Sequence, residues 1–331
     1  MSAVAFESLP LKRGSCGEAV QDLQSRLDAQ GIPCLPDPEG IFDSGTAAGV
    51  EAFQHVRGLR VDGICGPQTW AALVEAGFRL GDRFLYLRRP MLRGDDVADL
   101  QRRLSALGFD TGRVDGIFGE HTSSALAELQ RNVGLPVDGI LGGSTLRELR
   151  RVMPRYDHPE LVSQVRDHER LRNSPRTLLG RRIAIGEEGG LDLLVGAIRR
   201  RLTDSGAYVV PILHPDGSMH AAAANAAAVE AYLGLRVDQR SDHCTVSYYS
   251  GYNYESEGGR RLAELVERFA TSALGFPRGS TVGMSLPVLR ETRMPAVICE
   301  IGPPGAVVPR AQELGGALVE AIEAWVTAPI E

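Results

Sequence analysis

Apolar residues in the first half of the chain are spaced as on one face of a helix. Val97, Leu100, Leu104 and Leu107 follow one another at intervals of three, four and three residues, a spacing that gives a helix an apolar stripe. Asp-Gly pairs separate such stretches, and glycine supplies the backbone angles that a tight turn needs. The pattern predicts short helices that are joined by turns and packed through their apolar faces.

This pattern occurs twice along the chain. Residues 11–73 match residues 92–149 at an almost constant offset, and the run VDGI at 61–64 recurs at 137–140. Each copy predicts three helices, the third beginning in copy one at Gly66-Pro67, where proline suits the first helical position. We therefore expect two small all-α three-helix repeats, at residues 11–76 and 90–152.

The second half of the chain alternates short apolar runs with amphipathic stretches, which is typical of an α/β fold. Residues 153–180 are rich in proline and charge and predict a linker with one helix at 159–170. An alanine-rich helix is expected at 219–231. Residues 181–328 therefore predict an open-sheet α/β domain in a multidomain chain. Its strands are expected at 183–185, 208–213, 232–237, 244–249 and 294–302.

The apolar run at residues 294–302 contains a single carboxylate, Glu300, which is followed by Ile301-Gly302. Such a run is typical of a strand that is buried on both faces of a parallel sheet. In open α/β sheets the chemistry lies at the carboxyl ends of the strands. Glu300 is therefore the expected position of a catalytic acid or base.

Composition excludes several classes of protein. The chain of 331 residues has a net charge of −6, so general binding to nucleic acid or to an anionic membrane is not expected. Its five cysteines are widely spaced without a CxxC pair, which indicates free thiols in a reducing compartment. No apolar run is long enough for a membrane span, and the first residues do not form a signal peptide. We expect a cytoplasmic protein.

The repeats resemble the peptidoglycan-binding domain family. The likeness rests on a helix ending in Leu-Gln, a DGxFG turn, a second helix ending in Phe-Gln, and the motif VDGxxGxxT. This resemblance implies that the repeats hold a muropeptide ligand in a shallow groove. The motif residues themselves are expected to be core and turn positions, because apolar stripes usually serve packing.

The α/β half resembles the type 3 N-acetylmuramoyl-L-alanine amidases, a family of zinc hydrolases. The likeness rests on Ala224-Asn225, on VLRETRMPAV at 288–297, and on Glu300-Ile301-Gly302. The resemblance implies that Glu300 stands at the position of the catalytic base. It also implies three zinc ligands: a histidine after the first strand, a glutamate shortly beyond it, and a histidine ending the strand that follows Asn225.

This chain departs from that set of ligands. After Ile185 it reads Gly-Glu-Glu-Gly-Gly without a histidine, and the next helix begins too soon for a loop carrying the ligand glutamate. Counted without gaps from Asn225, Arg236 takes the place of the second histidine. A guanidinium stays protonated and has no lone pair to give to zinc. We therefore expect neither a zinc cofactor nor another metal, and Glu300 is expected to be idle.

Two other interpretations of this region stay open. One is a rebuilt metal site on expected strand ends, as opposed to ordinary loop residues there. Its candidate ligands are Glu187, His214, Asp238 and His243. The other is that Glu300 forms an ion pair with Arg236, because a buried carboxylate needs a partner. The alternative partners of Arg236 are Glu187 and Glu188.

Two such repeats with an amidase-like domain that carries arginine at a zinc position resemble a cytoplasmic regulatory branch of this family. The runs FRLGDRFLY at 78–86 and GDDVADLQ at 94–101 carry this likeness. It implies a partner enzyme of peptidoglycan precursor synthesis, UDP-N-acetylglucosamine enolpyruvyl transferase. It also implies control by phosphorylation of a C-terminal tail, which is not expected to apply because the chain ends at Glu331.

We therefore expect a non-catalytic amidase homologue that regulates or scaffolds peptidoglycan precursor synthesis by binding a protein or a muropeptide. The alternative is an active amidase that hydrolyses the muramoyl-L-alanine amide bond through a rearranged metal site. A third interpretation is a simple muropeptide-binding protein.

Overall fold

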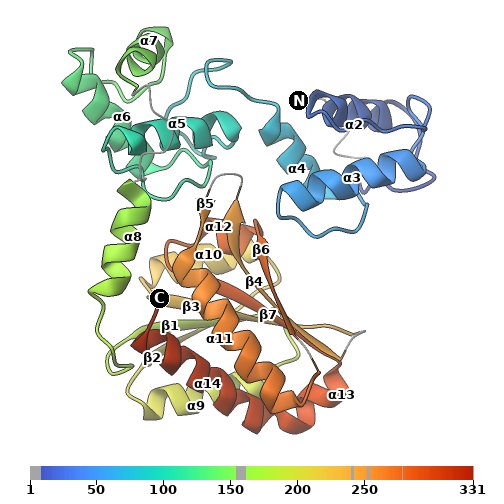
Figure 1. Cartoon of the computed structure of the whole chain (residues 1–331), viewed down its shortest axis with the longest axis vertical. Coiled ribbons are helices and arrows are strands. Elements are labelled where there is room, and N and C mark those ends of the chain that lie inside the picture. Colours follow the sequence, from blue (N-terminus) through green and yellow to red (C-terminus); the bar gives the residue numbers. More distant parts are fainter. Residues whose placement is uncertain (1–8, 154–161, 240–241, 252–253, 278, 331) are drawn as a thin grey trace. The chain divides into compact units, whose positions relative to one another are not determined.

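The computed structural model describes residues 9–153, 162–239, 242–251, 254–277 and 279–330. The chain divides into two compact units, Met1–Arg166 and Asp167–Glu331, which we call the N-terminal and C-terminal units. Figure 1 shows helices in the N-terminal unit and a sheet with helices in the C-terminal unit. This confirms the predicted order of small all-α repeats followed by an α/β domain.

Each repeat of the N-terminal unit has three helices around its own apolar core, as predicted. In repeat 1 the residues Val20, Leu23 and Leu27 are fully buried, and in repeat 2 the same is true of Leu100 and Leu104. The helices of repeat 1 are α2 (Glu18–Ala29), α3 (Ser44–Val56) and α4 (Pro67–Ala76). Those of repeat 2 are α5 (Asp95–Ala106), α6 (Glu120–Asn132) and α7 (Gly143–Val152).

A buried glutamine near the end of the second helix fixes the Asp-Gly turn of each repeat. Gln130 in α6 is 1% exposed, and its amide contacts the Asp138 carboxylate at 2.7 Å and the Thr145 hydroxyl at 3.2 Å. Its carbonyl accepts the Asp138 and Gly139 N–H groups at 3.1 and 2.9 Å. Gln54 makes the equivalent contacts in repeat 1. The motif glutamines are therefore structural.

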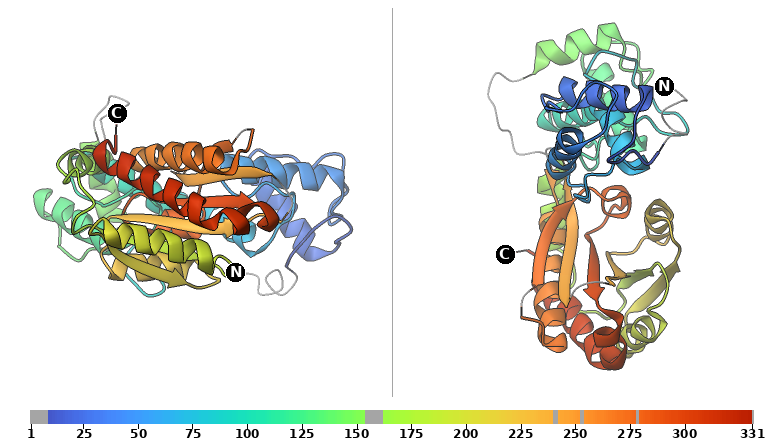
Figure 2. Two further views of the ribbon diagram at one scale, coloured as in Figure 1. Left: turned by 90° about the horizontal axis from the view of Figure 1, so that it is seen from below. Right: turned by 90° about the vertical axis from the view of Figure 1, so that its right-hand side faces the viewer.

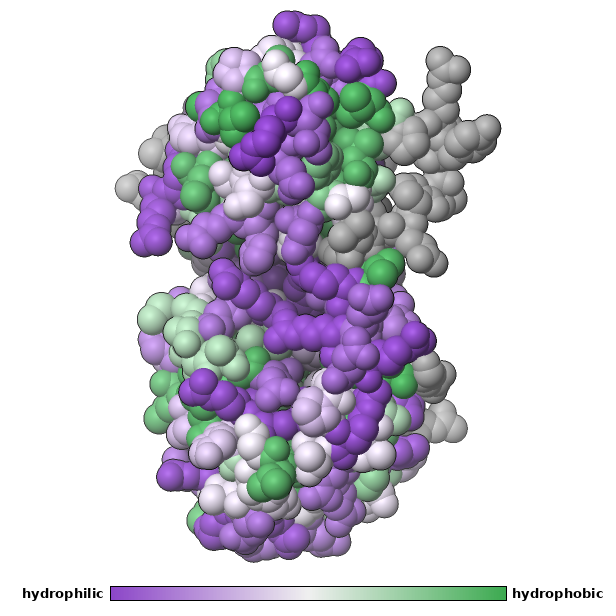
Figure 3. All heavy atoms as spheres, turned by 90° about the vertical axis from the view of Figure 1, so that its left-hand side faces the viewer, coloured by the Kyte–Doolittle hydropathy of each residue, from purple (hydrophilic) through white to green (hydrophobic). Residues whose placement is uncertain are grey.

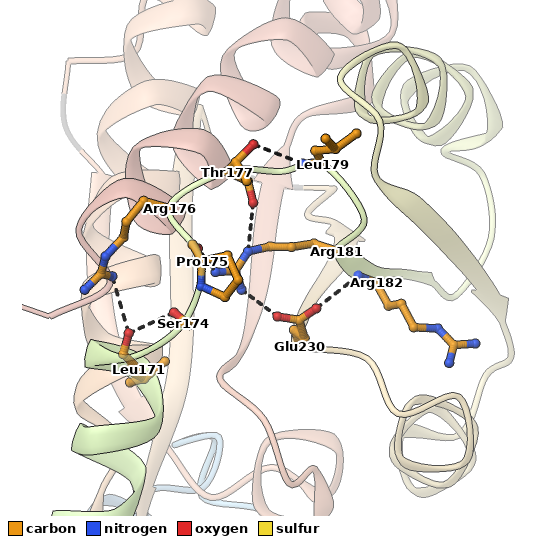
Figure 4. A network of polar contacts seen from close by, with 9 residues as sticks. All are labelled: Leu171, Ser174, Pro175, Arg176, Thr177, Leu179, Arg181, Arg182 and Glu230. Carbon is orange, nitrogen blue, oxygen red and sulfur yellow. Dashed lines mark hydrogen bonds and ion pairs between the residues drawn. The ribbon is translucent and has the colours of Figure 1, made fainter.

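The linker that was predicted at residues 153–180 contains helix α8 (Val162–Arg172). The first residues of the expected helix, 159–161, lie outside the described residues. After α8 the segment is fixed to the C-terminal unit by the buried Arg181 (Figure 4). Its guanidinium contacts the Glu230 carboxylate at 2.7 Å, the Thr177 carbonyl at 3.1 Å and the Pro175 carbonyl.

The C-terminal unit is built on a mixed seven-stranded sheet with the order β2-β1-β3-β7-β4-β5, in which β6 pairs with β4. The neighbouring pairs β2–β1, β1–β3 and β3–β7 are parallel, whereas β4 runs antiparallel to β7. The strands are β1 (Arg182–Glu187), β2 (Tyr208–Leu213), β3 (Ala231–Val237), β4 (His243–Gly251), β5 (Tyr254–Glu255), β6 (Gly279–Met284) and β7 (Ala296–Gly302).

Helices cover both faces of this sheet, giving three layers (Figure 2). On one face α9 (Asp192–Asp204), α11 (Glu257–Leu274) and α14 (Ala311–Thr327) enclose the main core, with α14 between the other two. On the other face lie α10 (Gly217–Ala226) and α12 (Pro287–Glu291). The short α13 (Pro304–Val307) and a 3₁₀ turn (Val308–Arg310) connect β7 to α14.

The structure corrects two predicted details. The helix expected at 219–231 ends at Ala226, because Ala228 adopts a positive φ of 48° and Ala231 already begins β3. Strands β5 and β6 were not predicted, because one has two residues and the other is a glycine-containing edge strand without a buried apolar run. None of the helices in the described ranges is long and apolar enough to cross a membrane.

Candidate functional site

The carboxyl ends of β1, β3 and β7 meet at one edge of the sheet and bring the expected residues together. Arg236 in β3 pairs in register with Glu300 in β7. In parallel strands, residues in register point to the same face. Arg236 and Glu300 therefore share a face with Tyr232 and Gly186, the face that α10 and α12 cover.

Arg236 forms an ion pair with Glu188, one of its three expected partners. Its Nε donates to Glu188 Oε1 at 3.1 Å, and its terminal nitrogen contacts the same oxygen. The two side chains are 32% and 38% exposed, so water screens the pair and its contribution to stability is small. For Glu300, no hydrogen bond or ion pair of the carboxylate occurs among the described residues, so the expected Glu300–Arg236 pair is not formed there.

Glu187 serves the fold at this edge. Its side chain is buried, and its carboxylate accepts the Leu191 N–H at 3.1 Å, where α9 begins. A carboxylate near the N-terminus of a helix is favoured by the helix dipole. The carboxylate of Glu187 therefore stabilises the start of α9, whereas that of the next residue, Glu188, pairs with Arg236.

A buried histidine and tyrosine lie beside Arg236, and sequence reasoning missed both. His220 in α10 is 3% exposed, and its Nδ1 lies 2.7 Å from the Tyr232 hydroxyl, while its Nε2 lies 2.7 Å from the His214 carbonyl. A carbonyl can only accept, so in the neutral ring Nε2 donates and Nδ1 accepts the tyrosine proton. Burial raises the pKa of Tyr232, which keeps the hydroxyl a donor.

This pair fills the space above β1. A β-carbon at Gly186 would lie 2.1 Å from the Tyr232 hydroxyl and 2.6 Å from His220 Nδ1, so no side chain fits at Gly186 unless the pair moves. What is left is a cavity of about 20 Å³ between Gly186, Glu188 and Arg236, room for about one water molecule. A lone histidine in an alanine-rich helix was the available signal, but pairing with Tyr232 depends on the fold.

The other three expected ligands stand at the ends of three different strands, β2, β3 and β4. His214 accepts the Asp216 N–H at its Nδ1, 2.9 Å away. His243 opens β4 and contacts the Ser280 hydroxyl at 3.1 Å. Asp238 follows β3, and its backbone N–H donates to the Ile301 carbonyl at 2.8 Å.

The residues at this edge do not fit a catalytic zinc ion. Such an ion needs about three neutral-nitrogen or anionic ligands and an open position. Arg236 supplies a fixed positive charge in place of a ligand, Glu187 is engaged with Leu191, and His220 has both ring nitrogens occupied. Within the described part of the chain, no three His, Cys, Asp or Glu residues form a group that could hold a metal.

The remaining amidase-like motifs support the edge structurally. Asn225 in α10 donates to the Glu291 carbonyl at 2.8 Å and accepts the Arg293 N–H at 2.9 Å, so it fixes the segment that leads into β7. Gly302 ends β7 where a β-carbon would lie 1.9 Å from the Asp238 carbonyl oxygen. Glycine is therefore required there by the close approach of the chain after β3.

A second candidate site lies in repeat 2 of the N-terminal unit. It is a groove of about 500 Å³ beside Phe84 and Tyr86, at the start of α7. A groove of this size suits a small-molecule ligand. The face drawn in Figure 3 is a mosaic of hydrophilic and hydrophobic residues.

The chain is similar to several known proteins. The peptidoglycan binding domain family matches residues 16–73 and 93–149, the two repeats. The N-acetylmuramoyl-L-alanine amidase CwlL of Bacillus licheniformis is 33% identical over 165 residues, 43% of this chain and 46% of that protein. Among solved structures, the amidase Ami1 of Mycobacterium smegmatis is 15% identical with a TM-score of 0.39, covering 45% of this chain and 98% of that one.

One relative spans most of both chains. The protein named N-acetylmuramoyl-L-alanine amidase CwlM, from Mycobacterium tuberculosis, is 36% identical over 331 residues. The match covers 88% of this chain and 81% of that protein. With this identity and coverage, the chain belongs to the N-acetylmuramoyl-L-alanine amidase family.

Proposed function

We propose that this chain is a non-catalytic member of the amidase family that acts by binding. The observation that carries the proposal is the Arg236–Glu188 ion pair at the end of β3, in register with Glu300. A guanidinium cannot ligate zinc and repels a dication. Without a bound metal that lowers the pKa of water, the carboxylate of Glu300 has no activated nucleophile to deprotonate.

The proposed role is regulation or scaffolding of peptidoglycan precursor synthesis in the cytoplasm. The resemblance to the regulatory branch of the family supports UDP-N-acetylglucosamine enolpyruvyl transferase as the protein partner. The two peptidoglycan-binding-like repeats support a muropeptide as the small ligand. Binding of the transferase or of a muropeptide does not require the hydrolytic chemistry of the amidase site.

Metal content and turnover test the loss of catalysis. The chain is purified from zinc-supplemented cells, its zinc is measured by mass spectrometry, and muropeptide cleavage is assayed with and without added zinc. We expect substoichiometric zinc and no cleavage, and Glu300→Gln should behave like the unchanged chain. Arg236→His should not restore cleavage, because a single ligand cannot hold the ion. One zinc per chain with turnover that Glu300→Gln abolishes would establish the rearranged active amidase instead.

Reconstitution with the purified enolpyruvyl transferase tests the regulatory role. Adding the chain to that enzyme should increase its rate of enolpyruvyl transfer, and the two proteins should co-elute in size-exclusion chromatography. Heat-denatured chain serves as the matched control. If the rate and the elution are both unchanged, the regulatory role fails, and muropeptide binding alone would favour the simple binding protein.

A further inference from the structure

We infer that the Phe84–Tyr86 groove of repeat 2 binds the saccharide part of a peptidoglycan fragment, and that repeat 1 has no equivalent site. The groove is the 500 Å³ recess lined by these two rings, by Asp138 and Ile140, and by residues 142–145. This inference rests on the proposed muropeptide binding and assigns to it one place and one ligand class.

The two rings stand on the same side of an extended segment. Leu85 lies between them, is fully buried, and exchanges backbone hydrogen bonds with Leu141 at 2.8 and 3.4 Å. Side chains alternate along extended backbone, so Phe84 and Tyr86 both point away from the core that holds Leu85. They are 65% and 39% exposed, which presents their apolar faces to a ligand.

The Phe84 ring is seated against the backbone of Gly142. A β-carbon at Gly142 would lie 3.3 Å from Phe84 Cε1, closer than an ordinary carbon contact. The absence of a side chain at Gly142 thus lets the edge of an exposed ring approach the turn before α7 closely. A positioned aromatic face is suited to the C–H face of a sugar ring, which packs on aromatic groups by dispersion.

Polar groups of the groove suit hydroxyl and acetamido groups and disfavour carboxylates. In the described residues no side chain caps the start of α7, so the N–H groups of Gly143 and Ser144 are placed to donate to a carbonyl. Hydrogen bonds lower the pKa of Asp138; the larger effect comes from the Ile140 N–H and the smaller from the Gln130 amide. The Asp138 carboxylate is therefore charged and can accept hydrogen bonds from ligand hydroxyls. Among the described residues, Asp138 is the one charged side chain that lines the groove, and it repels the carboxylates of an acidic stem peptide. The guanidinium of Arg147 is nearby, and its terminal nitrogen lies 3.8 Å from where a β-carbon at Gly143 would stand.

Repeat 1 provides a built-in comparison. The bridge between Leu11 and Cys65 corresponds to the bridge between Leu85 and Leu141. Leu11 is therefore the counterpart of Leu85 and not of Leu92, with which the sequence match aligned it, and repeat 2 includes residues before 90. Pro10 and Lys12 thus stand where repeat 2 has Phe84 and Tyr86. Pro67 at the start of α4 stands where α7 has Gly143, and proline has no N–H to donate. Repeat 1 therefore lacks both the aromatic pair and one of the donors.

Binding of three defined probes to the full chain tests the inference. The probes are N-acetylglucosamine trimer, a disaccharide-tetrapeptide muropeptide and the free stem tetrapeptide, measured by calorimetry and by saturation-transfer NMR of the ligand protons. We expect the trimer and the muropeptide to bind, and the stem peptide to bind much more weakly. Phe84→Ala combined with Tyr86→Ala should weaken both saccharide probes about tenfold or more.

Matched variants separate the groove from other surfaces. Pro10→Ala with Lys12→Ala alters the equivalent positions of repeat 1 and should leave binding unchanged, whereas Gly142→Ala should weaken it by displacing the Phe84 ring. Unchanged trimer binding in the Phe84→Ala, Tyr86→Ala chain would refute the groove while leaving muropeptide binding intact. Binding of the stem peptide without the trimer would refute the saccharide class. Failure of every probe would refute the inference and the muropeptide ligand together, but not the partner enzyme.

Discussion

At the scale of single residues, the positions that define the repeat pattern hold the fold, and a different set faces solvent in the groove. Gln54 and Gln130 are buried, and the side-chain carbonyl of each accepts both N–H groups of the Asp-Gly turn in its repeat. Gly63 and Gly139 adopt the same φ of +68° in those turns, a left-handed conformation that glycine adopts readily. The two repeats therefore have equivalent internal hydrogen bonds, and they differ at the exposed positions that Phe84 and Tyr86 occupy in repeat 2.

Replacing Gln54 with leucine should destabilise repeat 1. The change leaves the Asp62 and Gly63 N–H groups without their acceptor, and a buried unpaired group costs about 1–3 kcal/mol. We expect the free energy of unfolding to fall by about 2–4 kcal/mol in urea titrations followed by the fluorescence of Trp70. Gln68→Leu, an exposed glutamine in α4, is the matched control. Equal effects of the two changes would show that the buried hydrogen bonds are not the cause.

Acid should weaken repeat 1 through Asp37. Burial alone would raise the pKa of Asp37, but hydrogen bonds from the N–H groups of Thr46, Gly45 and Asp43 outweigh it and lower the pKa to about 2. A carboxyl whose pKa is lower in the folded state contributes stability above its unfolded pKa of about 4, and this is lost as the pH falls toward about 2.

The urea midpoint of the Trp70 transition should therefore decrease between about pH 4 and pH 2. Asp37→Asn should be less stable at neutral pH and should show a shallower decrease in that interval, because the amide does not titrate. An identical decrease in both chains would assign the acid sensitivity to other carboxylates.

At the scale of elements, the strands that end at the candidate site could be predicted because their apolar runs are continuous. The run expected at 208–213 coincides with β2, and the expected 232–237 lies within β3. The ungapped count placed Arg236 at the carboxyl end of β3, in register with Glu300. Its pairing with Glu188 and the His220–Tyr232 contact were beyond the sequence, because both join elements through side chains whose directions depend on packing.

The segment between α8 and β1 should depend on Arg181. Its guanidinium holds two backbone carbonyls and the Glu230 carboxylate, so Arg181→Met leaves three acceptors without their donor. We expect the C-terminal unit to lose on the order of 2 kcal/mol or more of unfolding free energy. Cleavage by subtilisin within residues 173–180 should become faster.

The neighbouring Arg182 provides the matched control for this change. Its side chain is exposed, and its contact with Glu230 is made by the backbone N–H, so Arg182→Met removes the same charge without removing that contact. It should leave stability and cleavage nearly unchanged. If the two variants are cleaved equally fast, the network in Figure 4 does not hold the segment.

At the scale of the whole molecule, the two proposed activities belong to separate units. The amidase-like edge is built from β1, Glu188, β3, β7, α10 and α12 of the C-terminal unit, whereas the groove is built from repeat 2 together with its Phe84–Tyr86 segment. Each unit also has its own buried residues. A variant of one site is therefore expected to leave the other site intact.

Two tryptophans allow this separation to be measured directly. Trp70 lies in the core of repeat 1 and Trp325 in the core of the C-terminal unit, 5% and 2% exposed. With Trp325→Phe, the fluorescence transition in urea reports repeat 1, and with Trp70→Phe it reports the C-terminal unit. Leu23→Ala should cost about 2–5 kcal/mol in the first transition and nothing in the second, and Leu318→Ala should do the reverse, because both leucines are fully buried. A shift of both transitions by either change would show that the units unfold together.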